Sequence, residues 1–288
     1  MIVVTGASGQ LGHQIVQNLA GLMPADQIGV SLRDPAKAGG FAAMGIRVRQ
    51  GDFSDAASLR HSFEGAAQVL IVSSNAAAAG GDPLAQHRTA IEAARAAGVG
   101  RVIYTSHMAA SATSAFPPMR DHAATEDMLR QSGLAWTALR HGFYASSGLM
   151  MMGAGFDSGV LAVPQDGPVS WTAHADLAAA AALILRDEGR FDGPTPPLCG
   201  PEALDFAGLV EIASGLQAKS IRREVVADDV FRSGMAARQV PDRVVEIAMG
   251  FYRAARNGEF TSADPTLAQL LDRPLVTMRD LMVGRLGV

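Results

Sequence analysis

The residues best suited to chemistry in this chain are three glycines close to its start. Gly6, Gly9 and Gly12 form a G-x-x-G-x-x-G spacing between an apolar run at residues 1–5 and a helical pattern at residues 13–22. Glycine permits a tight turn that lets the backbone approach a pyrophosphate, and the N–H groups opening the next helix point at that anion. The pattern predicts a dinucleotide-binding βαβ unit, although α/β proteins that bind no nucleotide also contain such turns.

An arginine follows the second predicted strand, where such a unit selects its cofactor. Arg33 lies about 20 residues beyond the glycine turn, at a place where an acidic residue would bind the ribose 2′-hydroxyl of NAD. An arginine there fits the 2′-phosphate of NADP instead, and Lys37 is near enough to assist. The alternative is that Arg33 is a solvated loop residue.

Polar residues also follow the third and fourth predicted strands. Asp52 comes directly after the third strand, where its carboxylate either accepts from an adenine amino group or caps a loop. Ser73 and Ser74 end the fourth strand, where a cofactor bound at the carboxyl edge of the sheet passes. The sequence therefore offers these three residues as further cofactor ligands.

The usual proton donor of short-chain dehydrogenases, a tyrosine with a lysine four residues on, is missing from the sequence. The three tyrosines and the residues four positions later are Tyr104 and Met108, Tyr144 and Gly148, and Tyr252 and Arg256. The only lysines are Lys37 and Lys219, and we expect neither near the nicotinamide. A plain ketone benefits from a positioned acid, worth ~10²–10⁴ in rate, so the missing pair argues against alcohol and ketone chemistry.

Histidine and aromatic residues follow the fifth and sixth predicted strands. His107 and His141 are placed at the carboxyl edge of the sheet, where ligands bind, but a polar loop role is open for each. Phe143 and Tyr144 are suited to a ring-stacking wall or to ordinary core between lobes. No histidine pair has the metalloprotease spacing and no G-x-S-x-G elbow occurs, so we expect neither a metal site nor an α/β-hydrolase.

Composition limits the classes of protein to which the chain can belong. Of its 288 residues 48% are hydrophobic and 18% charged, with a net charge of −4, which indicates a globular protein with ample core. We expect no nucleic-acid or membrane partner, because there is no long basic run and the apolar run at 177–185 is too short to span. The single cysteine, Cys199, and an N-terminus without a basic region before its apolar stretch favour a cytoplasmic protein without a signal peptide.

Strands and helices alternate through the first 142 residues. The predicted strands cover residues 1–5, 27–32, 46–50, 68–72, 101–105 and 134–139. The predicted helices cover residues 13–22, 56–64, 83–97 and 120–132, with a flexible loop at 76–82. This alternation predicts a Rossmann doubly wound parallel sheet with helices on both faces.

The regular alternation of predicted strands and helices ends at residue 142. A flexible apolar patch at residues 149–152 precedes short strands at 159–163 and 169–172, a buried helix at 176–186 and a further strand at 221–226. The remaining predicted helices cover residues 206–216, 228–235, 241–256, 267–271 and 278–286. We expect residues 1–142 to form the NADP-binding domain, joined by a returning segment at about 169–200, and residues 143–288 to form mainly a smaller mixed α/β lobe.

Several segments resemble the NmrA-like atypical short-chain dehydrogenases/reductases. They are the turn Thr5–Gly12, the segment Arg33–Lys37 and the strand Arg101–Ser106. The segments His122–Glu126 and Leu139–Tyr144 look most similar to the branch of type 2 NADPH:quinone oxidoreductases and triphenylmethane-dye reductases. The resemblance covers about the first 190 residues well and the C-terminal lobe loosely. Relatives often carry asparagine where His141 stands, which bears on the polarity of the substrate pocket.

The resemblance implies a fold, a cofactor and an activity. It implies NADP(H) bound by Gly6, Ser8, Gly9, Gln10, Leu11, Arg33, Ser73 and Ser74, with a nicotinamide-side pocket near His141 to Tyr144. His107, from its place at the sheet edge, is a further candidate for contact with the substrate. The resemblance also implies reduction of a small aromatic or quinoid molecule or a cationic dye. Such acceptors are already electrophilic and need no protein acid, which agrees with the missing tyrosine–lysine pair. The alternative in this family is a non-catalytic NADP(H)-binding redox sensor, and the sequence leaves open whether the chain forms a homodimer.

Overall fold

A computed structural model describes residues 1–217 and 220–287, so Lys219 lies outside the described residues. The chain divides into two compact units. The first unit holds residues 1–107, 121–140 and 174–196, and the second holds residues 108–120, 141–173 and 197–288. Within the described part of the chain, no helix is long and apolar enough to cross a membrane.

This division differs from the expected boundaries in the returning segment, in residues 108–120 and in residues 141–142, which belong to the second unit. The returning segment of the first unit is 174–196, and residues 108–120 leave the first unit to join the second. The physical reason for the second difference is Phe116, whose ring packs edge-on against Phe251 and Phe260 in the core of the second unit. An aromatic residue in a loop between a strand and a helix of the Rossmann region gives no local signal of that distant partner.

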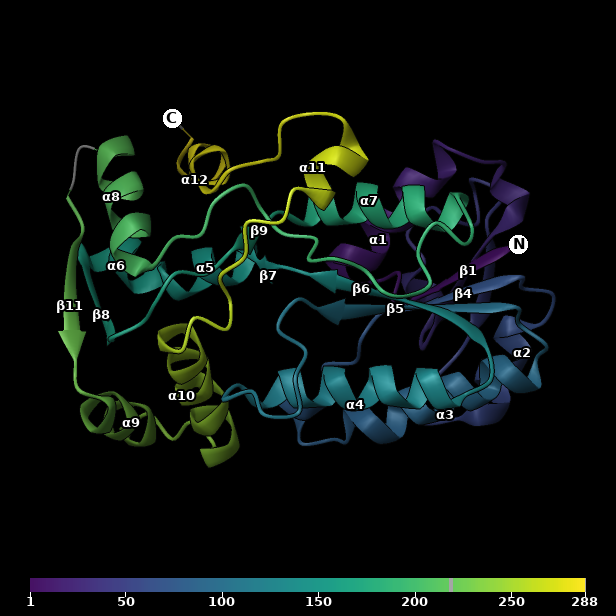
Figure 1. Cartoon of the computed structure of the whole chain (residues 1–288), viewed down its shortest axis with the longest axis horizontal. Coiled ribbons are helices and arrows are strands. Elements are labelled where there is room, and N and C mark those ends of the chain that lie inside the picture. The colour runs from purple at the N-terminus through teal and green to yellow at the C-terminus, as the bar shows by residue number, and fades with distance from the viewer. Residues whose placement is uncertain (218–219, 288) are drawn as a thin grey trace. The chain divides into compact units, whose positions relative to one another are not determined.

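A seven-stranded sheet forms the centre of the first unit, which confirms the predicted Rossmann-like fold (Figure 1). Its order is β10-β6-β5-β4-β1-β2-β3. The strands are β1 (Ile2–Thr5), β2 (Ile28–Leu32), β3 (Arg47–Gln50), β4 (Gln68–Ile71), β5 (Arg101–His107), β6 (Ala135–His141) and β10 (Gly193–Pro194). Strand β1 pairs in parallel with both β2 and β4. Strands β2 and β3 therefore lie on one side of β1, and β4, β5 and β6 lie on the other. The place between β1 and β4 is the switch point, where ligands bind in such sheets.

Helices cover both faces of this sheet. They are α1 (Gln10–Ala20), α2 (Ala56–Phe63), α3 (Pro83–Ala96), α4 (Pro117–Gln131) and α7 (His174–Arg186). Helices α1 and α7 lie against one face, and α2, α3 and α4 against the other (Figure 1). On the second face, Phe63, Ile91 and Leu129 from the three helices pack on the strands in one buried cluster. This cluster makes the carboxyl edge of β1, β4 and β5 a rigid support for the loops that follow it.

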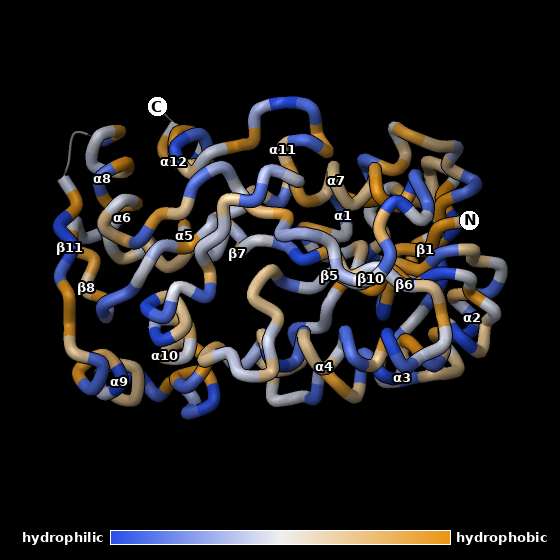
Figure 2. The backbone as a smooth tube through the Cα atoms, in the orientation of Figure 1, coloured by the Kyte–Doolittle hydropathy of each residue, from blue (hydrophilic) through white to orange (hydrophobic). Residues whose placement is uncertain are grey.

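Strand β1 forms as the sequence predicts because β-branched residues suit a fully buried strand. Val3 and Val4 have no exposed surface, and Figure 2 shows β1 in the hydrophobic colour. In the register of the sheet, Val4 lies opposite Val30 of β2 and Leu70 of β4. Helix α1 follows directly and begins at Gln10, three residues earlier than the expected start at residue 13. The helix therefore opens immediately beside the glycine turn.

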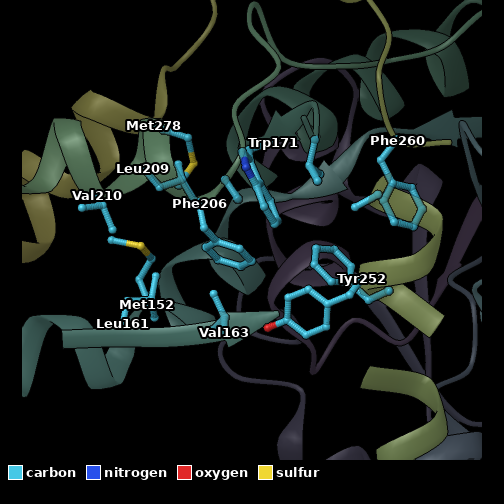
Figure 3. Packing of buried hydrophobic residues seen from close by; sticks show 14 of the residues in the cluster. Met152, Leu161, Val163, Trp171, Phe206, Leu209, Val210, Tyr252, Phe260 and Met278 are labelled. Atoms are coloured by element: carbon cyan, nitrogen blue, oxygen red, sulfur yellow. The ribbon is translucent and has the colours of Figure 1, made fainter. Parts of the chain in front are cut away.

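The second unit is a mixed α/β lobe built around aromatic residues. Its strands are β7 (Phe143–Tyr144), β8 (Val160–Pro164), β9 (Trp171–Thr172) and β11 (Arg222–Val226), and β7–β9 and β8–β11 form two parallel pairs. Its helices are α5 (Ala145–Met151), α6 (Gly153–Ser158), α8 (Phe206–Leu216), α9 (Asp228–Ala237), α10 (Asp242–Arg256), α11 (Thr266–Leu271) and α12 (Met278–Leu286). Figure 3 shows Trp171, Phe206, Tyr252 and Phe260 gathered with Met152 and aliphatic side chains in its core.

Residues 149–152, the expected flexible apolar patch, are helical or adjoin a helix. They lie in helix α5 and in the junction with α6, two short helices that the sequence pattern did not predict. Met152 is completely buried in the aromatic core, whereas Met150 is 73% exposed. Glycine at positions 148, 153 and 155 lowers helix propensity, so packing rather than local preference forms these helices.

Candidate functional site

The glycine turn after β1 has the geometry of a backbone cradle. Gly6 has a φ of +63°, a conformation that favours glycine, and its carbonyl accepts a 2.9 Å hydrogen bond from the N–H of Gly9. A Cβ on Gly12 would lie 2.5 Å from the Gly6 oxygen and 2.8 Å from the Gly6 carbon. Both glycines are therefore needed for helix α1 to start directly against the turn.

The start of helix α1 is arranged to receive an anion. Gly9 is its N-cap and supplies no side-chain hydrogen bond, and its first turn contains no acidic residue. Ser8, Gly9 and Gln10 are exposed, whereas Leu11 is buried and anchors the helix on the sheet. Open N–H groups and the helix dipole favour a phosphate at this position. The backbone of the turn and the open start of the helix therefore fit the pyrophosphate of a dinucleotide.

Three successive N–H groups that follow β4 are held by side chains from three neighbouring elements. The N–H of Val72 donates to Thr5 Oγ1 of β1 at 2.9 Å, and that of Ser73 donates to Thr105 Oγ1 of β5 at 2.8 Å. The N–H of Ser74 donates to Nε2 of His87 on α3 at 2.9 Å. The path of the chain across the switch point is thus fixed by side chains.

The hydroxyl of Ser74 is turned toward helix α3. It donates a hydrogen bond to Oε1 of Gln86 and accepts one from the N–H of Ala76. The hydroxyl of Ser73 accepts a 3.2 Å hydrogen bond from that of Thr105. Gly6 lies against this segment, since a Cβ built on it would be 3.2 Å from Cβ of Val72. The structure therefore brings the predicted ligands Gly6, Ser73 and Ser74 to one edge.

The residues that follow β2 and β3 are also at this edge of the sheet. Arg33 and Lys37 are both exposed, and the turn between them is held by the Asp34 carboxylate, which accepts from the N–H of Ala36. Asp52 is partly buried, and its Oδ1 accepts a 2.8 Å hydrogen bond from the N–H of Ser54. One carboxylate oxygen of Asp52 thus takes the loop role that the sequence left open, and its adenine contact stays a prediction.

A buried polar cluster lies at the carboxyl ends of β5 and β6 in the first unit. Both carboxylate oxygens of Glu126 accept hydrogen bonds from the Arg140 guanidinium, and one also accepts from the hydroxyl of Ser106. The hydrogen bond to Glu126 raises the pKa of Arg140. The ring of His107, the last residue of β5, lies 6.1 Å from that of His122. This cluster ties α4 to β5, whose last residue is His107, and to β6.

The predicted substrate residues His141, Phe143 and Tyr144 lie in the second unit. His141 is completely buried, and its carbonyl accepts a 2.8 Å hydrogen bond from the N–H of Met108. The Tyr144 ring is 6.4 Å from that of His141, and burial raises the pKa of Tyr144 to about 12. Gly142, which follows His141, has no room for a side chain, because a Cβ there would lie 2.2 Å from Thr172 Oγ1.

Phe143 is packed as a core residue. Its ring centroid is 5.1 Å from those of Phe251 and Phe260 and 5.5 Å from that of Trp171. Phe143 as a whole residue is only partly buried. The core role that the sequence left open is therefore clearly present, and a substrate contact by Phe143 stays a prediction.

Sequence reasoning missed the residues that hold the switch-point loop. Thr5 ends β1 and Thr105 lies two residues before the end of β5, and these two strands flank β4, so parallel pairing could have indicated both threonines. His87 gave no such signal, because it is a lone histidine inside a helical pattern.

The second unit also contains a cavity of about 340 Å³ lined by the 108–114 segment and Glu259, which the sequence did not indicate. Among the described residues, no group of three or more His, Cys, Asp or Glu side chains could hold a metal ion.

Comparison with known proteins gives a family and several full-length relatives. The sequence pattern of the NAD(P)H-binding family matches residues 6–188. Quinone oxidoreductase 2 of Escherichia coli is 34% identical over 281 residues, covering 97% of this chain and 96% of that protein. The crystal structure of the NADPH-dependent quinone oxidoreductase of Escherichia coli complexed with NADPH has a TM-score of 0.92 and 33% identity, covering 99% of this chain and 100% of the other. Citrobacter triphenylmethane reductase complexed with NADP(H) has a TM-score of 0.87 and 29% identity, covering 99% of each chain.

Proposed function

This chain belongs to the NAD(P)H-binding family, and we propose that it is an NADPH-dependent reductase that transfers hydride to an activated acceptor such as a quinone or a cationic dye. The observation that carries the proposal is similarity over nearly the whole chain to an NADPH-dependent quinone oxidoreductase. A relative that matched only the first unit would support cofactor binding alone. The match over both units extends the proposal to the acceptor.

The residues at the edge of the first unit would hold the cofactor. The backbone of Gly6 to Leu11 would receive the pyrophosphate, and Arg33 with Lys37 would bind the 2′-phosphate of NADPH. Ser73 and Ser74 would line the passage of the cofactor across the switch point. When bound, NADPH supplies a hydride from carbon 4 of its nicotinamide.

The protein's own contribution would be positioning rather than proton transfer. No tyrosine in the sequence is followed by a lysine four residues on, and burial keeps the Tyr144 phenol neutral. A quinone or dye cation accepts a hydride without simultaneous protonation, so holding two rings in contact and excluding water would suffice. We propose His107, His141, Phe143 and Tyr144 as the residues that orient the acceptor.

The test is NADPH oxidation followed by absorbance with and without acceptors. We expect turnover with a simple benzoquinone and with a triphenylmethane dye, and little with a plain aliphatic ketone. Oxidation of the ketone at a comparable rate would contradict the acid-free mechanism. Tight NADPH binding without reduction of any acceptor would instead favour the redox sensor.

A further inference from the structure

We propose that His87, a buried histidine of helix α3, is a positioning residue for NADPH that acts through the backbone of Ser74. The inference rests on the proposed cofactor site at the carboxyl edge of the first unit. His87 is 2% exposed and lies 13 residues beyond Ser74 in the sequence. Because it is buried, its ring acts on its surroundings through the hydrogen bonds that it makes.

Those hydrogen bonds determine the tautomer of the ring. The N–H of Ser74 can only donate, so Nε2 of His87 must accept and carry no proton. Nδ1 then carries the proton and donates to Thr125 Oγ1 at 2.9 Å, and the Thr125 hydroxyl donates to the carbonyl of Asp121 at 2.8 Å. All of these donors and acceptors are paired only when the imidazole is neutral and carries its proton on Nδ1.

The surroundings of the ring also favour the neutral form. Burial lowers the pKa of His87 to about 4, against the opposing charge of Asp82 at the start of the helix. The Tyr104 ring packs edge-on at 5.2 Å, and its hydroxyl is paired with Nδ1 of His122, whose own pKa is lowered to about 3 by burial. At neutral pH the ring therefore remains an acceptor toward Ser74.

What this acceptor controls is the loop at the switch point. Of the three side chains that hold successive N–H groups after β4, two are threonines on β1 and β5, within the sheet. The third, His87, comes from a helix, and Gln86 beside it binds the hydroxyl of the same serine. Helix α3 thus sets where the loop leaves the sheet, although His87 itself lies in a helix that covers the sheet and not at its carboxyl edge.

Two isosteric substitutions separate the two hydrogen bonds of the ring. His87→Gln places an amide oxygen where Nε2 lies and keeps an acceptor for Ser74. His87→Asn reaches only the position of Nδ1, so it keeps a partner for Thr125 and leaves the N–H of Ser74 without its acceptor. His61→Gln is the matched control, because His61 is exposed at the end of α2 and pairs with Glu64.

The experiment measures the Kd of NADPH by fluorescence titration, without acceptor, and kcat at saturating NADPH and benzoquinone. We expect His87→Asn to raise the Kd by about five- to tenfold, the scale of one hydrogen bond, and His87→Gln and His61→Gln to leave it nearly unchanged. We expect kcat to stay near its wild-type value in all three. If His87→Asn does not fold, Thr125→Val, which removes the acceptor of the Nδ1 proton and with it one of the two hydrogen bonds that hold the ring, should raise the Kd in the same direction.

Equal Kd values for His87→Asn and His87→Gln in folded protein would overturn the proposal. A loss of thermal stability in His87→Asn without any change in the Kd would also overturn it, because the histidine would then be only structural. Wild-type protein that binds no NADPH would overturn the proposed function and this inference together. Wild-type protein that binds NADPH but reduces no quinone would remove the proposed activity and leave the Kd comparison as a valid support for the inference.

Discussion

The glycine turn of the first unit and the ring cluster of the second unit use their residues in different ways. Around Gly6 and Gly12 the important property is the absence of side-chain atoms, which lets helix α1 begin beside the turn. Around Phe143 the important property is side-chain bulk, since its ring packs against those of Trp171, Phe251 and Phe260. Substitutions should therefore affect cofactor binding in the first region and folding stability in the second.

The largest effect should follow from adding one methyl group to the glycine turn. In Gly12→Ala the new Cβ would meet the Gly6 carbonyl at 2.5 Å, so the turn and the helix must separate. We expect the Kd of NADPH to rise by about 100-fold or more, the scale of losing one or two charge-assisted hydrogen bonds to the pyrophosphate at about 1.5–3 kcal/mol each. Fluorescence titration with NADPH measures it.

Gly153→Ala is the matched control in the second unit. A Cβ there has nothing within 4 Å, and the residue begins helix α6, so alanine should leave NADPH binding unchanged. Similar Kd values for the two variants would show that the close approach at Gly12 has no functional consequence.

In the second unit we expect the opposite pattern. Phe143→Ala should lower the free energy of unfolding by about 3 kcal/mol, because it removes a ring from the aromatic core. Its Kd for NADPH should stay within about twofold of wild type, while the KM for a quinone should rise, because the proposed acceptor site loses a ring. Denaturant unfolding and steady-state kinetics measure the two effects, and Phe143→Leu should show a smaller stability loss. A Phe143→Ala protein as stable as wild type would contradict its core role.

How far the sequence predicts these two regions follows from the range of the interactions in each. The turn at Gly6, the buried run of β1 and the alternation of strands and helices are local patterns, and the structure confirms the Rossmann-like sheet they predict. The polar residues after β1, β2 and β4 could be placed because parallel strands end at one edge.

The second region depends on partners far away in the sequence. Phe116 packs on Phe260, and Gly142 is required by the side chain of Thr172, so neither role is visible in a local window. Helices α5 and α6 contain glycines and methionines that give no clear helical pattern. His87 was missed for the same reason, because its partners Ser74 and Thr125 come from two other segments.

A smaller effect should separate the two cofactors in the first unit. Arg33 is exposed at the end of β2, and charge-assisted hydrogen bonds contribute ~1.5–3 kcal/mol. Arg33→Ala should therefore raise the Kd of NADPH by roughly 10- to 150-fold and that of NADH hardly at all. Arg60→Ala, an exposed arginine on α2, is the control and should change neither. Equal losses for both cofactors would argue against a 2′-phosphate contact by Arg33.

The smallest effect should come from Tyr144, where only a hydroxyl is removed. Tyr144→Phe keeps the ring beside His141, and burial raises the pKa of Tyr144 to about 12, so its phenol stays protonated throughout the neutral range. A group whose pKa is raised this far neither gains nor loses a proton between about pH 6 and 9. We expect wild type and Tyr144→Phe to share a nearly flat rate of hydride transfer over that range, measured by single-turnover NADPH oxidation. The pKa values of His87 and His122, about 4 and 3, place their protonation below it. A loss of ~10³-fold or more in Tyr144→Phe, the scale of a general acid, would show that this phenol donates a proton. In that case the second unit would contribute chemistry as well as packing.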